Sequence, residues 1–69
     1  MPRYKLEVFE PPEQLRNRRE FFEVDDAAAI KWADAFYDDE LSAGVRLDRY
    51  VLYDGARIVR ERVEPKRAV

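Results

Sequence analysis

The side chains with the clearest chemical potential in this chain are its carboxylates and its arginines. The sequence has 69 residues, with 13 Lys plus Arg, 15 Asp plus Glu, and neither His nor Cys. The commonest general base, the thiolate nucleophile and the soft ligands of structural zinc are therefore missing. Ser42 is the only serine and has no histidine to activate it, and Gly44 and Gly55, the only glycines, form no phosphate-binding loop. We therefore expect a protein that is not an enzyme and that uses no cofactor and no metal ion.

The carboxylates are concentrated in the middle of the chain. The net charge is +2 over residues 1 to 19, −7 over residues 20 to 40 and +3 over residues 41 to 69. One interpretation is a solvated helix face whose first acids cap the helix. The other is a docking surface for a basic partner protein, because acids at the negative C-terminal end of a helix cost local stability, and Asp34 repels Asp38 one turn away. The candidate protein-binding acids are Asp34, Asp38 and Asp39.

Two aromatic side chains are further candidates for binding another protein. Trp32 lies at the rim of the apolar side of the expected helix, where it either completes the core edge or, if exposed beside Asp39, serves as a binding anchor. Alternation places Phe21 on the sheet face that the helix does not cover, together with Phe9, Val51 and Val59. Such an apolar open face favours binding to another protein or formation of a homodimer.

The arginines indicate a second class of partner. Ten arginines stand against three lysines, and arginine forks match phosphate geometry, while tyrosines among them can stack on bases. The alternative function is therefore RNA or DNA binding by an arginine-rich C-terminal hairpin. A net charge of −2 and a pI near 5.1 weaken this alternative, because long-range attraction to nucleic acid would be small. Its candidate residues are Arg49, Arg57, Arg60, Arg62 and Tyr53.

The elements that would position these residues are read from hydrophobic periodicity. Residues 3 to 9 alternate, with Tyr4, Leu6 and Val8 on one side, which predicts a strand. Pro11 and Pro12 end it, and the polar stretch from Glu13 to Asn17 is expected to form a connection. A second strand is predicted over residues 19 to 24, with Phe22 and Val24 inward. A helix should begin at Asp25 or Asp26 and run to about Leu41, with Gly44 as its terminator.

The last two strands are predicted over residues 46 to 53 and 56 to 63, around the hairpin signal Asp54-Gly55. A strict two-residue loop would set Asp48 opposite Glu61. We favour a three-residue loop with Gly55 in a bulge, which pairs Asp48 with Arg60. One face of this hairpin is then apolar, with Tyr50, Leu52, Ala56 and Ile58, and the other is mixed, with Arg49, Val51, Arg57 and Val59.

The sum is an α+β domain of the order β-β-α-β-β, with one helix packed on an antiparallel or mixed sheet of three or four strands. We expect a single domain over residues 1–63 and a flexible tail over 64–69. No apolar run approaches the roughly 20 residues of a membrane span, so no membrane association is expected. The lack of cysteine favours a cytoplasmic location, because small domains outside the cell usually depend on disulfides.

The opening Met1-Pro2-Arg3-Tyr4 and the helix start Asp25-Asp26-Ala27-Ala28-Ala29 resemble a group of small proteobacterial proteins. The resemblance covers about a quarter of the chain, implies a small α+β fold and brings no known activity. The expected function is a small non-enzymatic protein-binding module, and an inhibitor of the kind that phages and mobile elements encode would fit this description.

Overall fold

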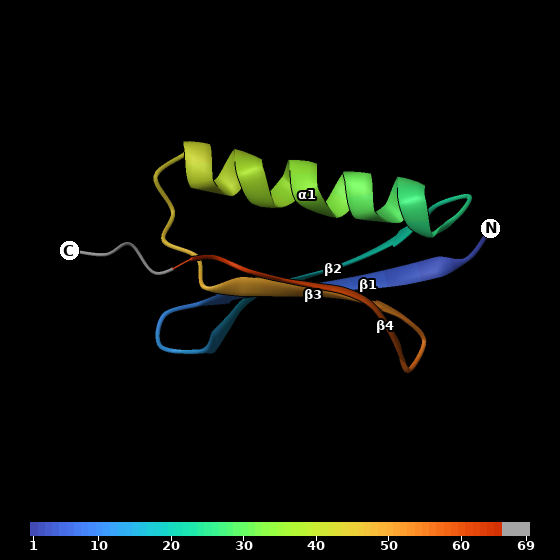
Figure 1. Ribbon diagram of the computed structural model, residues 1–69, viewed down its shortest axis with the longest axis horizontal. Helices are drawn as coiled ribbons and strands as arrows, with labels where there is room; N and C mark the ends of the chain where they lie inside the picture. Colours follow the sequence, from blue (N-terminus) through green and yellow to red (C-terminus); the bar gives the residue numbers. More distant parts are fainter. Residues whose placement is uncertain (66–69) are drawn as a thin grey trace.

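A computed structural model describes residues 1–65 and shows one helix packed against a four-stranded antiparallel sheet (Figure 1). The chain order is β1 (Arg3–Glu10), β2 (Gln14–Phe22), α1 (Asp26–Ser42), β3 (Arg49–Asp54) and β4 (Arg57–Val63). The strands are arranged β2-β1-β3-β4, so β2 and β4 are the edges of the sheet. The predicted α+β class and element order are confirmed.

The core lies between α1 and the two central strands. Tyr4, Leu6 and Val8 point from β1 toward the helix, as the alternation of that strand predicts. The helix contributes two fully buried alanines and Tyr37, which is one of the largest fully buried side chains. The remaining buried members of the core come from α1, the loop after it and β3, namely Ala29, Ala33, Tyr37, Leu47, Tyr50 and Leu52.

The helix begins and ends as its sequence predicts. The side chain of Asp25 caps its start by accepting a 2.9 Å hydrogen bond from the Ala28 N–H. At its end, the N–H of Gly44 donates to the Leu41 carbonyl at 3.0 Å, and Gly44 has a φ of +86°, a left-handed conformation that suits glycine. These two residues fix how much of the chain is helical and therefore where the acids and aromatics of α1 lie.

Strand β2 differs from its prediction in both extent and orientation. It begins at Gln14, within the stretch expected to be a connection, and is offset by a bulge between its Asn17 and Leu15 pairs with β1. Phe21 is the residue that packs against the core, whereas Phe22 is 61% exposed and Val24 is 65% exposed. The predicted inward positions of Phe22 and Val24 are therefore wrong.

The β3–β4 hairpin is confirmed, but its predicted register is wrong. Asp54 pairs with Arg57, so the two-residue loop is Gly55-Ala56, with Gly55 at a φ of +62° in the first position. A bulge at Val59 then shifts the pairing, and Leu52 lies opposite Arg60. Val59 packs toward the core while Ile58 is 60% exposed, the reverse of the predicted faces.

The end of the described chain continues from β4. The N–H of Glu64 donates a 2.8 Å hydrogen bond to the carbonyl of Asp48, which extends the β3–β4 pairing by one step. The rest of the predicted flexible tail, residues 66–69, lies outside the described residues. Within residues 1–65, no helix is long and apolar enough to cross a membrane.

Candidate functional site

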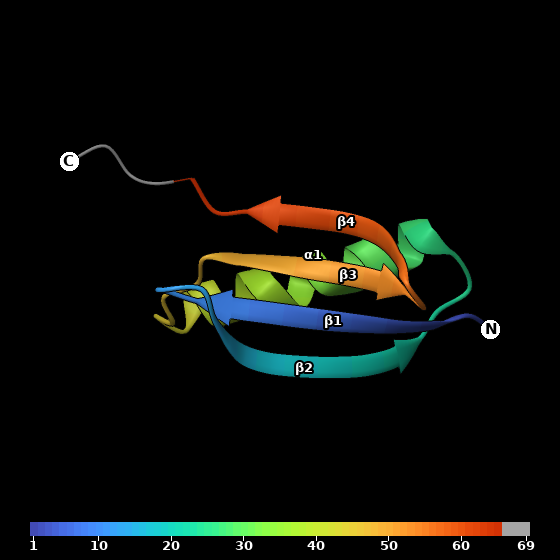
Figure 2. The same cartoon turned by 90° about the horizontal axis from the view of Figure 1, so that it is seen from below.

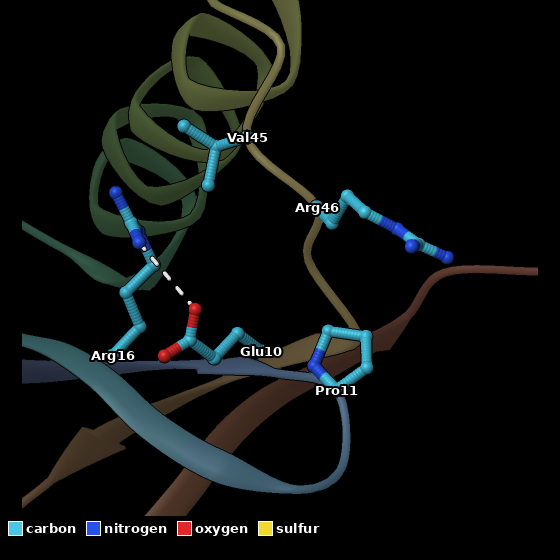
Figure 3. Close-up of a pocket in the computed structure, with 5 residues that line it drawn as sticks. All are labelled: Glu10, Pro11, Arg16, Val45 and Arg46. Atoms are coloured by element: carbon cyan, nitrogen blue, oxygen red, sulfur yellow. Dashed lines mark hydrogen bonds and ion pairs between the residues drawn. The ribbon is translucent and has the colours of Figure 1, made fainter.

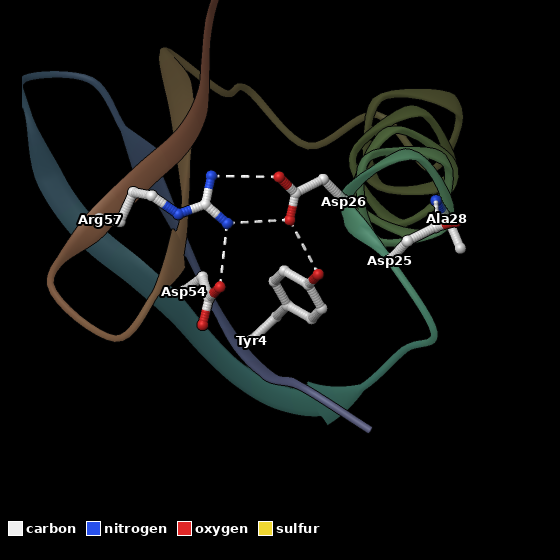
Figure 4. Close-up of polar contacts among 6 residues, drawn as sticks. All are labelled: Tyr4, Asp25, Asp26, Ala28, Asp54 and Arg57. Carbon is white, nitrogen blue, oxygen red and sulfur yellow. Dashed lines mark hydrogen bonds and ion pairs between the residues drawn. The ribbon is translucent and has the colours of Figure 1, made fainter.

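The first helical turn is held to the hairpin by a bidentate ion pair. Both guanidinium ends of Arg57 donate to the carboxylate of Asp26, at 3.1 and 3.0 Å, and Arg57 also donates to Asp54 at 2.9 Å (Figure 4). The buried Tyr4 donates its hydroxyl to the same Asp26 carboxylate at 2.9 Å. Hydrogen bonds from Arg57 and then from Tyr4 lower the pKa of Asp26 below its ordinary value.

The next two acids on this side of the helix are paired in the same way. Asp34 accepts hydrogen bonds from the Tyr50 hydroxyl at 2.6 Å and from Arg62 at 3.2 Å, and Arg60 lies 3.5 Å from it. Arg62 also donates to Asp38 at 2.9 Å. We call this set the ion-pair row; it contains Asp26, Asp34 and Asp38 from α1 and Arg57, Arg60 and Arg62 from β4.

The ion-pair row joins two surfaces that the sequence treats as separate. Asp34 and Asp38, predicted to meet a basic partner, face Arg60 and Arg62, predicted to meet nucleic acid. Charge that is satisfied within the chain offers less attraction to an external partner. Asp39, the third predicted acid, lies away from this row, is exposed and forms no ion pair with residues 1–65.

The open face of the sheet also carries internally paired charges. Arg49 donates to Glu61 at 3.1 Å and its guanidinium lies 4.2 Å from the centre of the Phe9 ring, while the Lys5 ammonium lies 4.8 Å from the centre of the Tyr53 ring. Arg49 and Tyr53 therefore lie on this face, at opposite ends of β3, whereas Arg57, Arg60 and Arg62 approach the helix. The structure does not bring the five predicted nucleic-acid residues together on one surface.

The opposite flank of the helix is aromatic. The rings of Phe21 and Trp32 stack with centroids 3.9 Å apart, and Trp32 stacks on Phe36 at 5.6 Å. All three side chains are half-buried and pack against the core, and we call them the aromatic row. Trp32 lies at the core edge. The predicted position of Phe21 on the open face is wrong. The bulge in β2 sets Phe21 opposite Tyr4, whose buried side chain faces the helix, and Phe22 is the residue that points outward.

The aromatic row lies beside a strand edge whose outward backbone groups have no partner within residues 1–65. The N–H of Glu23 donates to the carbonyl of Pro2. In an antiparallel pair every second residue bonds to the neighbouring strand, so Phe21, Arg19 and Asn17 are the β2 residues that bond to β1. The N–H and C=O groups of Arg18, Glu20 and Phe22 then point away from β1. Figure 2 shows α1 crossing behind β1 and β3, with β2 outside it. Sequence reasoning missed this edge because it began the second strand at Arg19 instead of Gln14 and turned Phe22 inward.

Two shallow depressions lie on the surface of the described residues. The first, of about 340 Å³, is lined by Glu10, Pro11, Arg16, Val45 and Arg46 (Figure 3). Arg16 lies 3.4 Å from Glu10 in it. The second, of about 430 Å³, is lined by Arg3, Tyr4, Lys5, Glu20, Asp54 and Gly55. Neither holds a nucleophile beside a base, and residues 1–65 contain no cluster of three potential metal ligands.

The comparisons with known proteins found no matching family model, no matching curated protein and no matching solved structure. The resemblance to small proteobacterial proteins stays a prediction.

Proposed function

We propose that the chain is a small, non-enzymatic protein-binding module, and that its docking surface is the outer edge of β2 together with the aromatic row. We call this surface the β2 margin. The proposal rests on one observation: a half-buried aromatic stack, with Phe21 and Trp32 3.9 Å apart, lies directly beside an edge strand with outward-facing backbone groups. We also propose a cytoplasmic location, because the chain has no cysteine for a disulfide.

The binding mode that this edge favours is addition of an extended protein segment as a further strand. An unpaired edge presents alternating N–H and C=O groups that can bond a segment of any sequence, while the neighbouring side chains provide selectivity. Aromatic side chains are enriched among the residues that contribute most to protein interfaces. Trp32 and Phe36 stand on the helix side of this edge, where they can contact alternate side chains of an added strand.

The other surfaces support docking less well. Most charges on the ion-pair row and on the open sheet face have partners within the chain. The outer edge of β4 carries arginines and a bulge, as β2 does, but β4 contains no aromatic residue comparable to Phe21, which stacks on Trp32 beside β2. The β2 margin therefore combines an accessible backbone edge with apolar area.

A proline scan of the two sheet edges tests this proposal with a matched control. Glu20→Pro removes an outward N–H from β2 and leaves the β1–β2 ladder bonds in place. Glu61→Pro does the same on β4, and each change removes one exposed ion pair, with Arg3 or with Arg49. Both variants and the wild type would be immobilised and exposed to nuclease-treated lysate of the native host.

We expect a protein retained by the wild type and by Glu61→Pro but lost from Glu20→Pro. Circular dichroism melting of both variants verifies that they are folded. Equal retention by both variants would exclude the β2 edge as the docking surface, and retention of nucleic acid alone before nuclease treatment would favour the arginine-based alternative.

A further inference from the structure

We propose that the β2 margin binds a second copy of this chain, with β2 pairing antiparallel to its counterpart around a two-fold axis at Arg19. This inference rests on the proposed function, because it assigns a partner to the same surface. Two-fold dimers with the same patch on both subunits are the commonest protein assemblies. In the resulting dimer the two sheets would merge into one continuous sheet.

The register of this pairing follows from the outward-facing backbone groups. Only Arg18, Glu20 and Phe22 present N–H and C=O groups along the regular part of β2, so these residues must face one another across the axis. An axis at Arg18 places Arg18 opposite Arg18, and an axis at Glu20 places Glu20 opposite Glu20. An axis at Arg19 sets Arg18 opposite Glu20, and symmetry repeats this favourable pair.

Both side chains retain hydrogen-bonding capacity for this contact. Arg18 donates from Nε and Nη2 to Oε2 of Glu7, at 3.2 and 3.0 Å, and its Nη1 forms no hydrogen bond within residues 1–65. Glu20 accepts from Arg3 through Oε2 and has Oε1 available. The side chains of Arg18 and Glu20 are 54% and 48% exposed, so each can reach a neighbour beyond the edge.

The one like-charged contact in this register is moderated by the fold. Arg19 meets its own counterpart at the axis, on the helix side of the sheet. Its guanidinium lies 5.7 Å from the centre of the Phe36 ring of its own chain, which directs the charge toward the helix. The position of Arg19 against Phe36 therefore leaves the backbone edge accessible at the axis.

The aromatic row has a suitable size for the space between the two helices. Strands lie about 4.8 Å apart, so β1 and its counterpart would be separated by roughly 14 Å across the two β2 strands. Helices in direct contact lie about 8–10 Å apart, so helices placed over the central strands would leave a gap. Trp32 and Phe36 project from α1 toward β2 and would fill that gap from both sides. The dimer would thereby cover the half-exposed aromatic rings.

Charge reversal tests the register directly. Sedimentation equilibrium would measure the dissociation constant of the wild type, Arg18→Glu, Glu20→Arg and the double variant. Each single variant places like charges opposite at both symmetric contacts, and we expect dimerisation to weaken roughly tenfold or more. The double variant restores opposite charges at both contacts, and its dissociation constant should return to near the wild-type value.

Mixing the two single variants provides a second measurement, which does not require both substitutions in one chain. In a heterodimer of Arg18→Glu with Glu20→Arg, both contacts pair opposite charges, so the mixture should dimerise where each variant alone is monomeric. Melting temperatures verify that each variant is folded. A monomeric wild type, or single variants that dimerise as tightly as the wild type, would overturn the proposal. The proline scan would still decide whether the β2 margin binds a different protein.

Discussion

The carboxylate of Asp34 accepts a 2.6 Å hydrogen bond from the hydroxyl of Tyr50, a side chain with no exposed surface. This bond joins the middle of α1 to strand β3, and Arg62 reaches the same carboxylate from β4 at 3.2 Å. Hydrogen bonds to charged groups contribute more than those between neutral groups, and a buried hydroxyl that loses its partner incurs a desolvation cost. Asp34 therefore stabilises the fold, whatever else it contacts.

Asp34→Ala should lower the free energy of unfolding by about 1–3 kcal/mol, because it leaves the Tyr50 hydroxyl without its partner. Asp39→Ala is the control, since Asp39 is exposed on the same helix and in no ion pair with residues 1–65, and it should change that free energy by less than about 0.5 kcal/mol. Urea unfolding measures both. Equal effects would contradict the assignment of Asp34 to an internal contact.

Phe21 and Phe22 are adjacent in sequence and differ in burial, so they test the orientation of β2. Phe21→Ala removes a ring stacked on Trp32 and should cost about 2 kcal/mol, somewhat less than the roughly 3–5 kcal/mol of a fully buried phenylalanine. Phe22→Ala should cost less than about 0.5 kcal/mol, because Phe22 is 61% exposed. Chemical denaturation followed by the fluorescence of Trp32, the only tryptophan, reads out both, and a larger loss for Phe22→Ala would reverse the orientation.

The acid limb of the stability profile should depend on Asp26. Arg57 and Tyr4 lower the pKa of this carboxyl in the folded chain, so the folded state binds its proton less readily than the unfolded state does. The stabilisation is complete above the unfolded pKa of about 3.9 and is lost as the pH falls through the lower folded value.

Asp26→Asn and Arg57→Gln should each flatten the decline of the melting temperature below about pH 4. Thermal melts between neutral and acid pH measure this slope. Profiles that run parallel to the wild type over the whole range would show that this ion pair contributes no pH dependence.

The hairpin loop tests the corrected β3–β4 register. Gly55 has a φ of +62°, so Gly55→Ala should destabilise the fold by about 1 kcal/mol, the cost of placing a Cβ in a left-handed conformation. Ala56→Gly serves as the comparison, because the backbone of Ala56 lies outside the left-handed region, and it should cost less. Thermal unfolding measures both, and a larger cost at position 56 would contradict a loop that begins at Gly55.

Strong local patterns made much of the fold predictable. Tyr4, Leu6 and Val8 alternate with charged residues, and Asp25 and Gly44 mark the two ends of the helix with side-chain and backbone signals. Strand β2 lacks such a pattern, because an edge strand exposes part of both faces and its first half is polar. Phe21 and Phe22 are adjacent at its end, and the sequence does not determine which of them points inward unless the position of the bulge is known.

The candidate site was less predictable, because it depends on how α1 lies across the sheet. The bulge at Val59 turns Arg60 and Arg62 toward the helix, and only then do they meet Asp34 and Asp38. The sequence predicts that Trp32 lies at the core edge or serves as a binding anchor. It does not predict that Trp32 stacks on Phe21, because this contact depends on the orientation of β2. The sequence identified the charged and aromatic residues, and tertiary packing determined their partners.

Site-specific photocrosslinking tests the central claim that the β2 margin binds protein. A photoreactive phenylalanine would replace Phe22, exposed on β2, or Lys31, exposed on the outer face of α1, in cells of the native host. We predict protein adducts from position 22 and none from position 31. Adducts from position 31 alone, or none from position 22, would contradict the account.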